Sequence, residues 1–393
     1  MERNIKIYYI EQFLAGMWFT LPVWVVFQLG FLNYSQMGLV AGLAYAVKTV
    51  LELPSGAVAD MLGRKKTVLI GWFISGLFFI TTGLSPNPTI LIISLLMIPV
   101  GVSLVSGADK ALLYDTLKEL KREKDFSKIQ ARSQGLFRLA MIVSIFSGGY
   151  LYQIFIALPY ILRGLLQIAI IIPFAFAIEP KIDSEVFSLK NYVKQNKQGM
   201  KELFKNTHNK SLTTYYVLIG GISWAGQSYY NNILANDVGF DEIGQSKIFA
   251  TIYIVTTLAI ILLAEQKITL TKTKAYISLP IILILSLIPG IFANKLIAYL
   301  MITGVTFVGG FRFAFLISYI NEELESKYRA TAVSGLHLLV GIFFVVIVSA
   351  GGWIQENYST GMVYSLMGLL ALISLVPSTY RLITNLHSHK TSL

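Results

Sequence analysis

The sequence predicts an all-α membrane protein with about twelve membrane-spanning helices in two halves. Three observations predict it. Of the 393 residues, 55% are hydrophobic and only 13% are charged, which leaves too little polar surface for a soluble domain. The apolar residues are grouped into runs of roughly 17–25, the length that a bilayer requires. One polar and basic connection, 179–210, is much longer than the others and divides these runs six and six.

The expected spans follow one another with short connections. Six precede the long connection, at 7–31, 35–59, 67–84, 89–113, 134–155 and 159–178, and six follow it, at 212–234, 243–263, 275–292, 296–320, 330–354 and 360–376. We therefore expect an N-terminal half at 1–178, a linker at 179–210 and a C-terminal half at 211–393. Apolar residues recur at helical spacing in the linker, with lysines largely between them. This pattern fits an amphipathic helix on the inner membrane surface or an irregular solvated segment.

Basic residues indicate the orientation of the chain. The formal net charge is +11, and roughly 25 of the 32 Lys and Arg residues are cytoplasmic if both termini are cytoplasmic. Lys295 is then the only basic residue in an external loop. The basic excess is therefore a topology signal, and not a surface for nucleic acid. We expect cytoplasmic termini, a place in the inner (plasma) membrane, contact with membrane lipid, and a monomer.

Several chemistries are not indicated. Cys is absent and the four His residues are scattered, so we expect no disulfide and no metal site. The sequence has no Gly-x-x-x-x-Gly-Lys-Ser/Thr loop, so nothing indicates ATP hydrolysis. The first apolar run lacks a small-residue cleavage site, and we expect it to span the membrane. We expect no cofactor and no enzymatic activity.

A motif stands between the second and third apolar runs, formed by Gly56, Asp60, Gly63, Arg64 and Lys65. Gly56 permits the close approach of a neighbouring helix, and Asp60 places a carboxylate one turn later at the membrane edge. Gly63 permits a tight turn, and the basic residues after it face the cytoplasm. This spacing resembles the signature between the second and third helices of the major facilitator superfamily.

The resemblance implies two six-helix halves related in parallel, with the substrate between them and access that alternates as one half rocks against the other. It also implies that Asp60, Arg64 and Asp115 form a charge relay that docks the two halves. Segments 319–334 and 111–115 look like a bacterial, drug-exporter-like branch. Residues 140–149 depart from the usual exporter pattern in the fifth helix, because only the final Gly pair is kept.

Ionisable residues inside a membrane are costly, so each one needs a reason. Glu11 and Asp109 are expected on helices that line the cavity of the resembling fold, where they are candidates to bind the transported proton. Arg138 is placed where it can pair with Asp109. Lys48 and Glu52 lie four residues apart on one helix face, and we interpret them as a static ion pair.

The C-terminal half carries a polar stripe on its first helix. Gln227, Tyr230 and Asn231 belong to this stripe and Trp224 lies beside it, so these residues are expected to form one wall of the substrate cavity. Arg312, in the middle of a later helix, is a candidate to neutralise a substrate anion or a carboxylate. The glycines of Gly38-x-x-x-Gly42 are expected to pack helices rather than to bind substrate.

The sequence leaves two transport functions open. We favour a secondary transporter that exports a small organic or amphiphilic molecule in exchange for protons. The alternative is a proton-coupled or facilitated importer of a small nutrient. A membrane enzyme or a receptor that does not transport fits less well, because no nucleophile–base group and no metal site are found.

Overall fold

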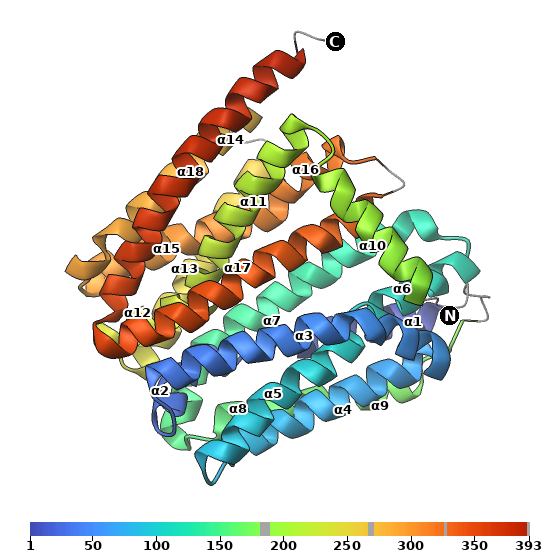
Figure 1. Ribbon diagram of the computed structural model, residues 1–393. Coiled ribbons are helices and arrows are strands. Elements are labelled where there is room, and N and C mark those ends of the chain that lie inside the picture. The colour runs from blue at the N-terminus through green and yellow to red at the C-terminus, as the bar shows by residue number, and fades with distance from the viewer. Residues whose placement is uncertain (181–188, 266–270, 326–327, 391–393) are drawn as a thin grey trace. The chain divides into compact units, whose positions relative to one another are not determined.

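The computed structural model describes residues 1–180, 189–265, 271–325 and 328–390, and all regular elements in these ranges are helical (Figure 1). Helices α1 to α9 occupy Glu2–Ala15, Trp24–Leu29, Tyr34–Leu62, Arg64–Gly83, Pro88–Val105, Ala108–Glu119, Phe126–Ile154, Leu158–Ala169 and Ile171–Ala175. Helices α10 to α18 occupy Leu189–Leu203, Thr207–Ala225, Asn231–Asp237, Glu242–Ala264, Lys272–Leu287, Lys295–Phe311, Ile317–Glu323, Arg329–Asn357 and Thr360–Lys390. Two 3-10 turns are η1 (Glu123–Asp125) and η3 (Ile288–Phe292), and two π-helical turns are η2 (Gly226–Tyr230) and η4 (Arg312–Leu316).

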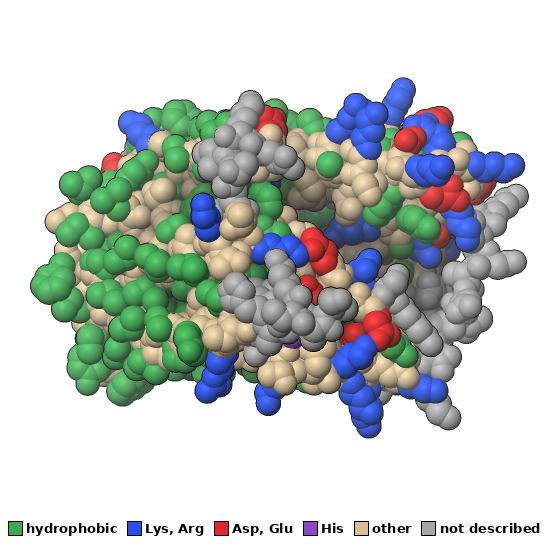
Figure 2. All heavy atoms as spheres, turned by 90° about the horizontal axis from the view of Figure 1, so that it is seen from above, with side chains coloured by type: hydrophobic (Ala, Val, Ile, Leu, Met, Phe, Trp, Pro, Cys, Tyr) green, Lys and Arg blue, Asp and Glu red, His purple; other side chains and the backbone are tan. Residues whose placement is uncertain are grey.

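Apart from the first, each predicted span coincides with a helix or with helices that follow one another closely. Within the described ranges, nine helical segments are long and apolar enough to cross a membrane. Figure 2 shows one face on which hydrophobic side chains cover one part and Lys, Arg, Asp and Glu side chains gather on another. The protein is therefore a multi-pass membrane protein, because such bands of apolar surface are stable only against lipid.

The chain forms two compact units. Unit 1 comprises Met1–Leu32, Leu43–Ser188 and Asp241–Ala250, and unit 2 comprises Asn33–Gly42, Leu189–Phe240 and Thr251–Leu393. Helix α3 thus begins in unit 2 and continues in unit 1, whereas α13 begins in unit 1 and continues in unit 2. The division at 179–210 into two similar halves stays a prediction.

Small residues bring helices together inside unit 1. A Cβ atom added to Gly71 of α4 would lie 2.7 Å from the Gly101 carbonyl oxygen of α5. A Cβ atom on Gly76 would lie equally close to the Gly164 carbonyl oxygen of α8, at 2.7 Å. Helix α4 therefore packs backbone to backbone against both neighbours, which is how membrane helices associate where all side chains are as apolar as lipid.

Glycines also pack the first part of α3 inside unit 2. A Cβ atom on Gly38 would lie 2.7 Å from the Val348 carbonyl oxygen and 3.1 Å from the Cα atom of Gly352 in α17. A Cβ atom on Gly42 would lie 2.5 Å from the Ser349 hydroxyl oxygen. These contacts confirm that Gly38-x-x-x-Gly42 packs helices.

The first predicted span, 7–31, is not one continuous helix as expected. It breaks between α1 and α2, where Pro22 has no N–H to donate and Gly16 packs against the backbone of α7. The Ser144 hydroxyl oxygen accepts a hydrogen bond of 2.7 Å from the Trp18 N–H, which the break has freed. A side chain of a neighbouring helix thus supplies the partner that lipid cannot.

Residues 189–203 of the predicted linker form helix α10, which confirms a helix there and rules out the alternative of an irregular segment for these residues. The side chains of 189–193 lie outside the described residues, as do residues 181–188. From residue 194 on, the apolar side of α10 packs against α17 and α11, as the contacts of Gly199 with Thr331 and of Leu203 with Thr213 show. This side is therefore covered by protein rather than lipid.

Candidate functional site

Two buried carboxyl groups form the centre of unit 1, and we call Glu11 and Asp109 the carboxyl pair. Glu11 is 0% exposed and Asp109 is 6% exposed. The two carboxyl groups are close enough to interact electrostatically. The Trp72 indole N–H donates to Glu11 Oε1 at 2.8 Å, and the Gln12 amide N–H donates to Asp109 Oδ2 at 3.3 Å. Glu11 Oε2 and Asp109 Oδ1 have no hydrogen-bond partner among the residues that the structure describes.

Three helices hold the pair. Glu11 and Gln12 lie on α1, Trp72 on α4, and Asp109 in the first turn of α6. The predicted span 89–113 breaks just before Asp109, contrary to the expectation of one helix, because Gly107 has φ +94°. This conformation is open to glycine and strained for other residues, so the chain ends α5 and starts α6 in a new direction. The break places Asp109 at a helix start instead of in mid-helix.

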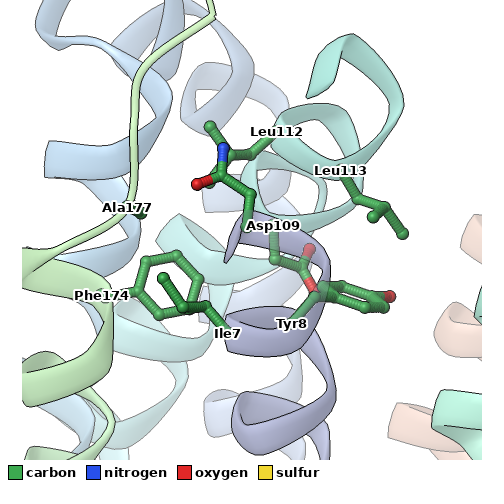
Figure 3. Close-up of a pocket in the computed structure, with 8 residues that line it drawn as sticks. Ile7, Tyr8, Asp109, Leu112, Leu113, Phe174 and Ala177 are labelled. Carbon is green, nitrogen blue, oxygen red and sulfur yellow. The ribbon is translucent and has the colours of Figure 1, made fainter. Parts of the chain in front are cut away.

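A cavity of about 10 Å³ lies beside Asp109, which is room for about one water molecule. Its lining comes from α1, α6, α9 and the residues flanking them, namely Asn4, Ile7, Tyr8, Asp109, Leu112, Leu113, Phe174 and Ala177. Figure 3 shows Asp109 among these side chains, with Tyr8, Ile7 and Phe174 below it and Leu112 above it in this view. Except for Asp109, Asn4 and the Tyr8 hydroxyl, the lining is apolar, so water reaches the carboxyl group only in small numbers.

Of the other charged groups of unit 1, Lys110 follows Asp109 in the chain and interacts electrostatically with its carboxyl group. Arg138, Lys48, Glu52 and Arg163 have other surroundings. The structure places no carboxylate of the described chain within ion-pair distance of Arg138, so the expected contact with Asp109 is not formed. Lys48 Nζ and Glu52 Oε1 are 3.5 Å apart, which confirms the ion pair expected on that helix face. Arg163 stacks on Trp18, 4.7 Å from its ring centroid, and donates to the Thr20 hydroxyl at 2.9 Å.

A second group of charges lies where α3 turns into α4. Gly63 has φ +88°, which permits the turn, and Arg64 begins α4. The Arg64 guanidinium pairs with Asp115 of α6 and donates to the Ala111 carbonyl oxygen at 2.7 Å. Lys65 Nζ donates to the Ala175 carbonyl oxygen at 2.7 Å. The side chains of Gly56 and Asp60 lie outside the described residues, so their part in this group stays a prediction.

Glu179 completes this group, and sequence reasoning missed it. Its two carboxylate oxygens accept hydrogen bonds from the backbone N–H groups of Arg64, at 2.7 Å, and Lys65, at 2.8 Å. These N–H groups are unpaired at the start of α4, where a negative charge is favourable. Glu179 is more than 110 residues away in sequence, and no local pattern signals the contact.

Unit 2 buries a positive charge. Arg312 of η4 is 1% exposed, and its guanidinium carbon lies 4.1 Å from the Phe313 ring centroid, 5.4 Å from that of Tyr216 and 5.9 Å from that of Trp224. Arg312 Nη1 also lies 3.4 Å from the Tyr216 hydroxyl oxygen, a long hydrogen bond. Aromatic faces attract a guanidinium, most strongly where water is excluded. The structure thus brings the predicted residues Trp224 and Arg312 together and adds Tyr216.

The other predicted substrate residues of unit 2 have packing partners. The Tyr230 hydroxyl donates to the Ile347 carbonyl oxygen at 3.1 Å, and the Asn231 amide N–H donates to the Thr306 hydroxyl at 3.1 Å. Gln227 lies over Gly309, where a Cβ atom would be 2.1 Å from Gln227 Oε1. The π turn η2 explains the difference from the expected stripe, because an extra residue in a turn rotates later side chains by about 100° relative to α periodicity.

The end of unit 2 at α10 is held by acidic residues after α15. Lys272 of α14 pairs with Glu322, and His208 Nε2 of α11 lies 3.8 Å from Glu323 Oε2. Lys205 pairs with Glu325, and this hydrogen bond is the first cause of a raised pKa of the Lys205 ammonium. Three carboxylates of one segment thus bind bases from three different segments.

Comparisons with known proteins agree with this architecture. A family model of the Major Facilitator Superfamily matches residues 8–288. This chain belongs to the Major Facilitator Superfamily. Members of this family are transporters, so the protein is a membrane transporter of small molecules.

Curated relatives are transporters as well. The uncharacterized MFS-type transporter YxaM of Bacillus subtilis is 24% identical over 354 residues, covering 84% of this chain and 85% of the relative. The multidrug resistance protein MdtH of Blochmanniella pennsylvanica is 23% identical over 418 residues, covering 99% and 92%. MdtH of Blochmanniella floridana is 24% identical over 343 residues, covering 84% and 80%.

Solved structures match the fold over nearly the whole chain. The nucleoside transporter NupG has a TM-score of 0.74 at 15% identity, covering 97% of this chain and 98% of that one. The POT family transporter PepTSo has a TM-score of 0.69 at 12% identity, covering 98% and 97%. These likenesses concern the fold alone.

Proposed function

We propose that this transporter exports a small organic or amphiphilic molecule across the inner (plasma) membrane and takes up protons in exchange. Twelve spans with both termini in the cytoplasm and a monomeric state belong to this proposal. The relatives named multidrug resistance proteins support the direction of transport. Alternating access supplies the mechanism, since the binding of cargo and of protons is coupled through one conformational change.

The observation that carries the proposal is the carboxyl pair. Glu11 and Asp109 are buried, each has one oxygen bound to a neutral donor, and the other oxygen of each has no partner among the described residues. A proton on the free oxygen cancels the charge of such a group, and its release restores the charge. A buried carboxyl group of this kind therefore responds to proton binding with a large change in local electrostatics.

The cavity beside Asp109 offers a route for the proton. Its volume of about 10 Å³ suits a single water molecule, and Asp109 is the only ionisable carboxyl group in its lining. We assign proton binding to Asp109 and Glu11. Arg138, half-buried and outside ion-pair distance in this structure, is assigned a pairing role in another conformation, because rocking of helices changes which charges meet.

We assign the gate to the signature residues Gly56, Asp60, Gly63, Arg64 and Lys65 together with Asp115. The pairing of Arg64 with Asp115 supports this role, because it ties the start of α4 to α6 through charged groups at the surface. Charged pairs at such a place exchange partners more readily than apolar contacts.

We assign cargo binding to unit 2. Trp224 and Arg312 offer an aromatic face and a positive charge, and Gln227 offers an amide beside them. Tyr230 and Asn231 support this wall through their packing contacts with neighbouring helices. An apolar wall with few polar groups suits an amphiphilic cargo.

Transport in proteoliposomes with an imposed pH gradient tests the direction and the coupling. Vesicles are loaded with a panel of labelled small molecules, and flux is followed with the gradient in either direction and after its collapse by an ionophore. We expect at least one cargo to move against its gradient and opposite to the protons. Movement in the same direction as the protons would indicate import, and flux that ignores the pH gradient would contradict proton coupling.

Cysteine labelling tests the topology. The chain contains no Cys, so single Cys residues at Gln195 and Asn294 provide unique sites. In sealed cells, we expect an impermeant reagent to label Asn294→Cys, in the predicted external loop, and not Gln195→Cys. The opposite pattern would refute cytoplasmic termini. If neither site is labelled, the experiment is repeated in permeabilised cells, where a cytoplasmic Cys becomes accessible to the reagent.

A further inference from the structure

Helix α10 has one face fixed to the rest of unit 2. A Cβ atom on Gly199 would lie 2.6 Å from the backbone nitrogen of Ala332, and one on Gly335 would lie 2.5 Å from Met200 Sδ. Leu203 is 0% exposed, and its carbonyl oxygen accepts a hydrogen bond of 2.9 Å from the Thr213 hydroxyl. The helix therefore lies directly on the backbone of α17 and cannot turn over to bury its apolar face in lipid.

The outer face of α10 is a row of lysines. Lys194, Lys197 and Lys201 are spaced by three and four residues, so they lie on one side of the helix, and all three are exposed. The structure describes no carboxylate within ion-pair distance of them. Glu202, the one acidic residue of the α10 sequence, is buried, about 100° around the helix from Lys201.

The depth of this row is set by the contact with α17. Gly199 touches Thr331, which lies in the first turn of α17, and α17 contains an apolar segment that is able to cross the membrane. Figure 1 shows α10 crossing the direction of α11 and α17 instead of running along them. Phe204, which follows α10, is 45% exposed, as is common for aromatic residues at the membrane boundary.

We propose that Lys194, Lys197 and Lys201 form a binding site for the headgroups of anionic phospholipids, which hold α10 against α17. Among the described residues these three positive charges have no carboxylate partner. Near the start of a membrane-crossing helix they lie among lipid headgroups, so charge complementarity favours phosphate there. The contact is electrostatic alone, because the apolar face of α10 is occupied by α17. An acidic soluble protein would have to displace the headgroups that already surround this level.

Energy transfer from a label on α10 to labelled lipid tests the proposal. A donor dye is attached at Gln195→Cys, an exposed position between the lysines of a chain that has no other Cys. The full-length protein is reconstituted in phosphatidylcholine vesicles with a trace of acceptor-labelled phosphatidylglycerol or acceptor-labelled phosphatidylcholine. We expect more transfer to phosphatidylglycerol, and we expect this preference to fall as salt rises from about 50 to about 500 mM.

Charge removal on α10 is compared with equal charge removal elsewhere. Lys194→Gln, Lys197→Gln and Lys201→Gln together should lower the preference for phosphatidylglycerol at least about fivefold, the effect of one basic residue near an anionic surface. The control, Lys118→Gln, Lys124→Gln and Lys128→Gln, removes three exposed lysines of unit 1 and should keep the preference.

Two results would overturn the proposal. One is equal transfer to both lipids at low salt in the parent, a measurement that needs no variant to fold. The other is a preference that survives in the α10 variant.

Discussion

Unit 1 buries two carboxyl groups, whereas unit 2 buries a guanidinium between aromatic rings. Each group of the carboxyl pair accepts a hydrogen bond from one neutral donor, and its other oxygen has no partner among the described residues. Asp109 also lines a small cavity. The Arg312 guanidinium lies over the Phe313 and Tyr216 rings and donates a long hydrogen bond to the Tyr216 hydroxyl. A carboxyl group can lose its charge by binding a proton, but a guanidinium stays charged at every physiological pH. The carboxyl pair of unit 1 is therefore a charge that can be switched, and Arg312 of unit 2 is a charge that is constant.

The two units also place their charges by different backbone devices. In unit 1, the left-handed φ of Gly107 ends one helix and starts another, and Asp109 lies in the new first turn. In unit 2, the chain stays helical, and the π turn η4 contains Arg312. A break and a π turn both disturb the regular hydrogen bonding, and both are common at functional sites. The comparison suggests that each unit is locally irregular where its charge is buried.

Replacing the constant charge should give the largest effect. Arg312→Met keeps much of the side-chain volume without the charge, so we expect a folded protein whose transport falls at least about tenfold, equal to about 1.4 kcal/mol of lost interaction. Arg312→Lys keeps the charge but not the planar group, so its transport rate should lie between those of the parent and Arg312→Met. Initial transport rates and thermal unfolding measure this. Full activity of Arg312→Met would make Arg312 a packing residue only.

Charge removal at the start of α4 should reduce transport less than the loss of the Arg312 charge does. Arg64→Ala deletes the partner of Asp115, and Asp60→Asn removes the carboxylate of the signature. We expect severalfold slower transport with normal expression and cargo binding, because a surface pair sets a conformational equilibrium rather than the cargo site. Cargo binding and flux are measured on the same preparation. If both variants transport normally, the signature is only a topology signal.

A side chain added at Gly107, in the break before Asp109, should destabilise the protein. Gly107→Ala forces a Cβ atom into a left-handed conformation, which costs roughly 1–2 kcal/mol although no atom lies within 4 Å of it. Gly309→Ala in unit 2 meets only the end of the Gln227 side chain, which can move, so its cost should be smaller. Thermal unfolding of the two variants compares them. An equal loss would mean that the backbone conformation at Gly107 is not the limiting feature.

Glu179 should have the smallest effect. Glu179→Gln keeps one acceptor oxygen, replaces the other with an NH2 group that cannot accept, and removes the negative charge at the start of α4. A negative charge there is worth about 0.3–1 kcal/mol at an exposed helix end. We expect a slightly lower unfolding temperature and little change in flux. Glu119→Gln, an exposed carboxylate on α6, serves as the matched control and should change neither. An effect of Glu179→Gln larger than that of Arg64→Ala would make Glu179 the centre of this group.

The sequence predicts helices well wherever a long apolar run decides the structure, and each predicted span is helical. It fails where a single residue interrupts a run, as at Pro22 and Gly107, because the surrounding residues remain as apolar as in an unbroken helix. The candidate carboxyl groups are predictable, since charge inside an apolar run stands out. Their partners Trp72 and Gln12 are not predictable, because an ordinary packing residue carries no signal of its own.

Long-range contacts explain the remaining differences. Glu179 lies in the expected linker, and its role at the start of α4 depends on how α9 ends. Tyr230 and Asn231 fit a polar stripe by α periodicity, but the π turn rotates them into packing contacts with other helices of unit 2. Such features arise from tertiary packing, which periodicity in one helix cannot describe.

The most direct test of the central claim is uphill transport by Glu11→Gln, Asp109→Asn and the double variant, with Glu119→Gln as control. Cargo and internal pH are followed together in proteoliposomes under a pH gradient, and downhill exchange of cargo is measured without one. We predict that the double variant loses proton-driven accumulation and the linked pH change, keeps downhill exchange, and that Glu119→Gln behaves as the parent. Accumulation of cargo by the double variant at the rate of the parent would contradict the account, because the transported proton would then bind elsewhere.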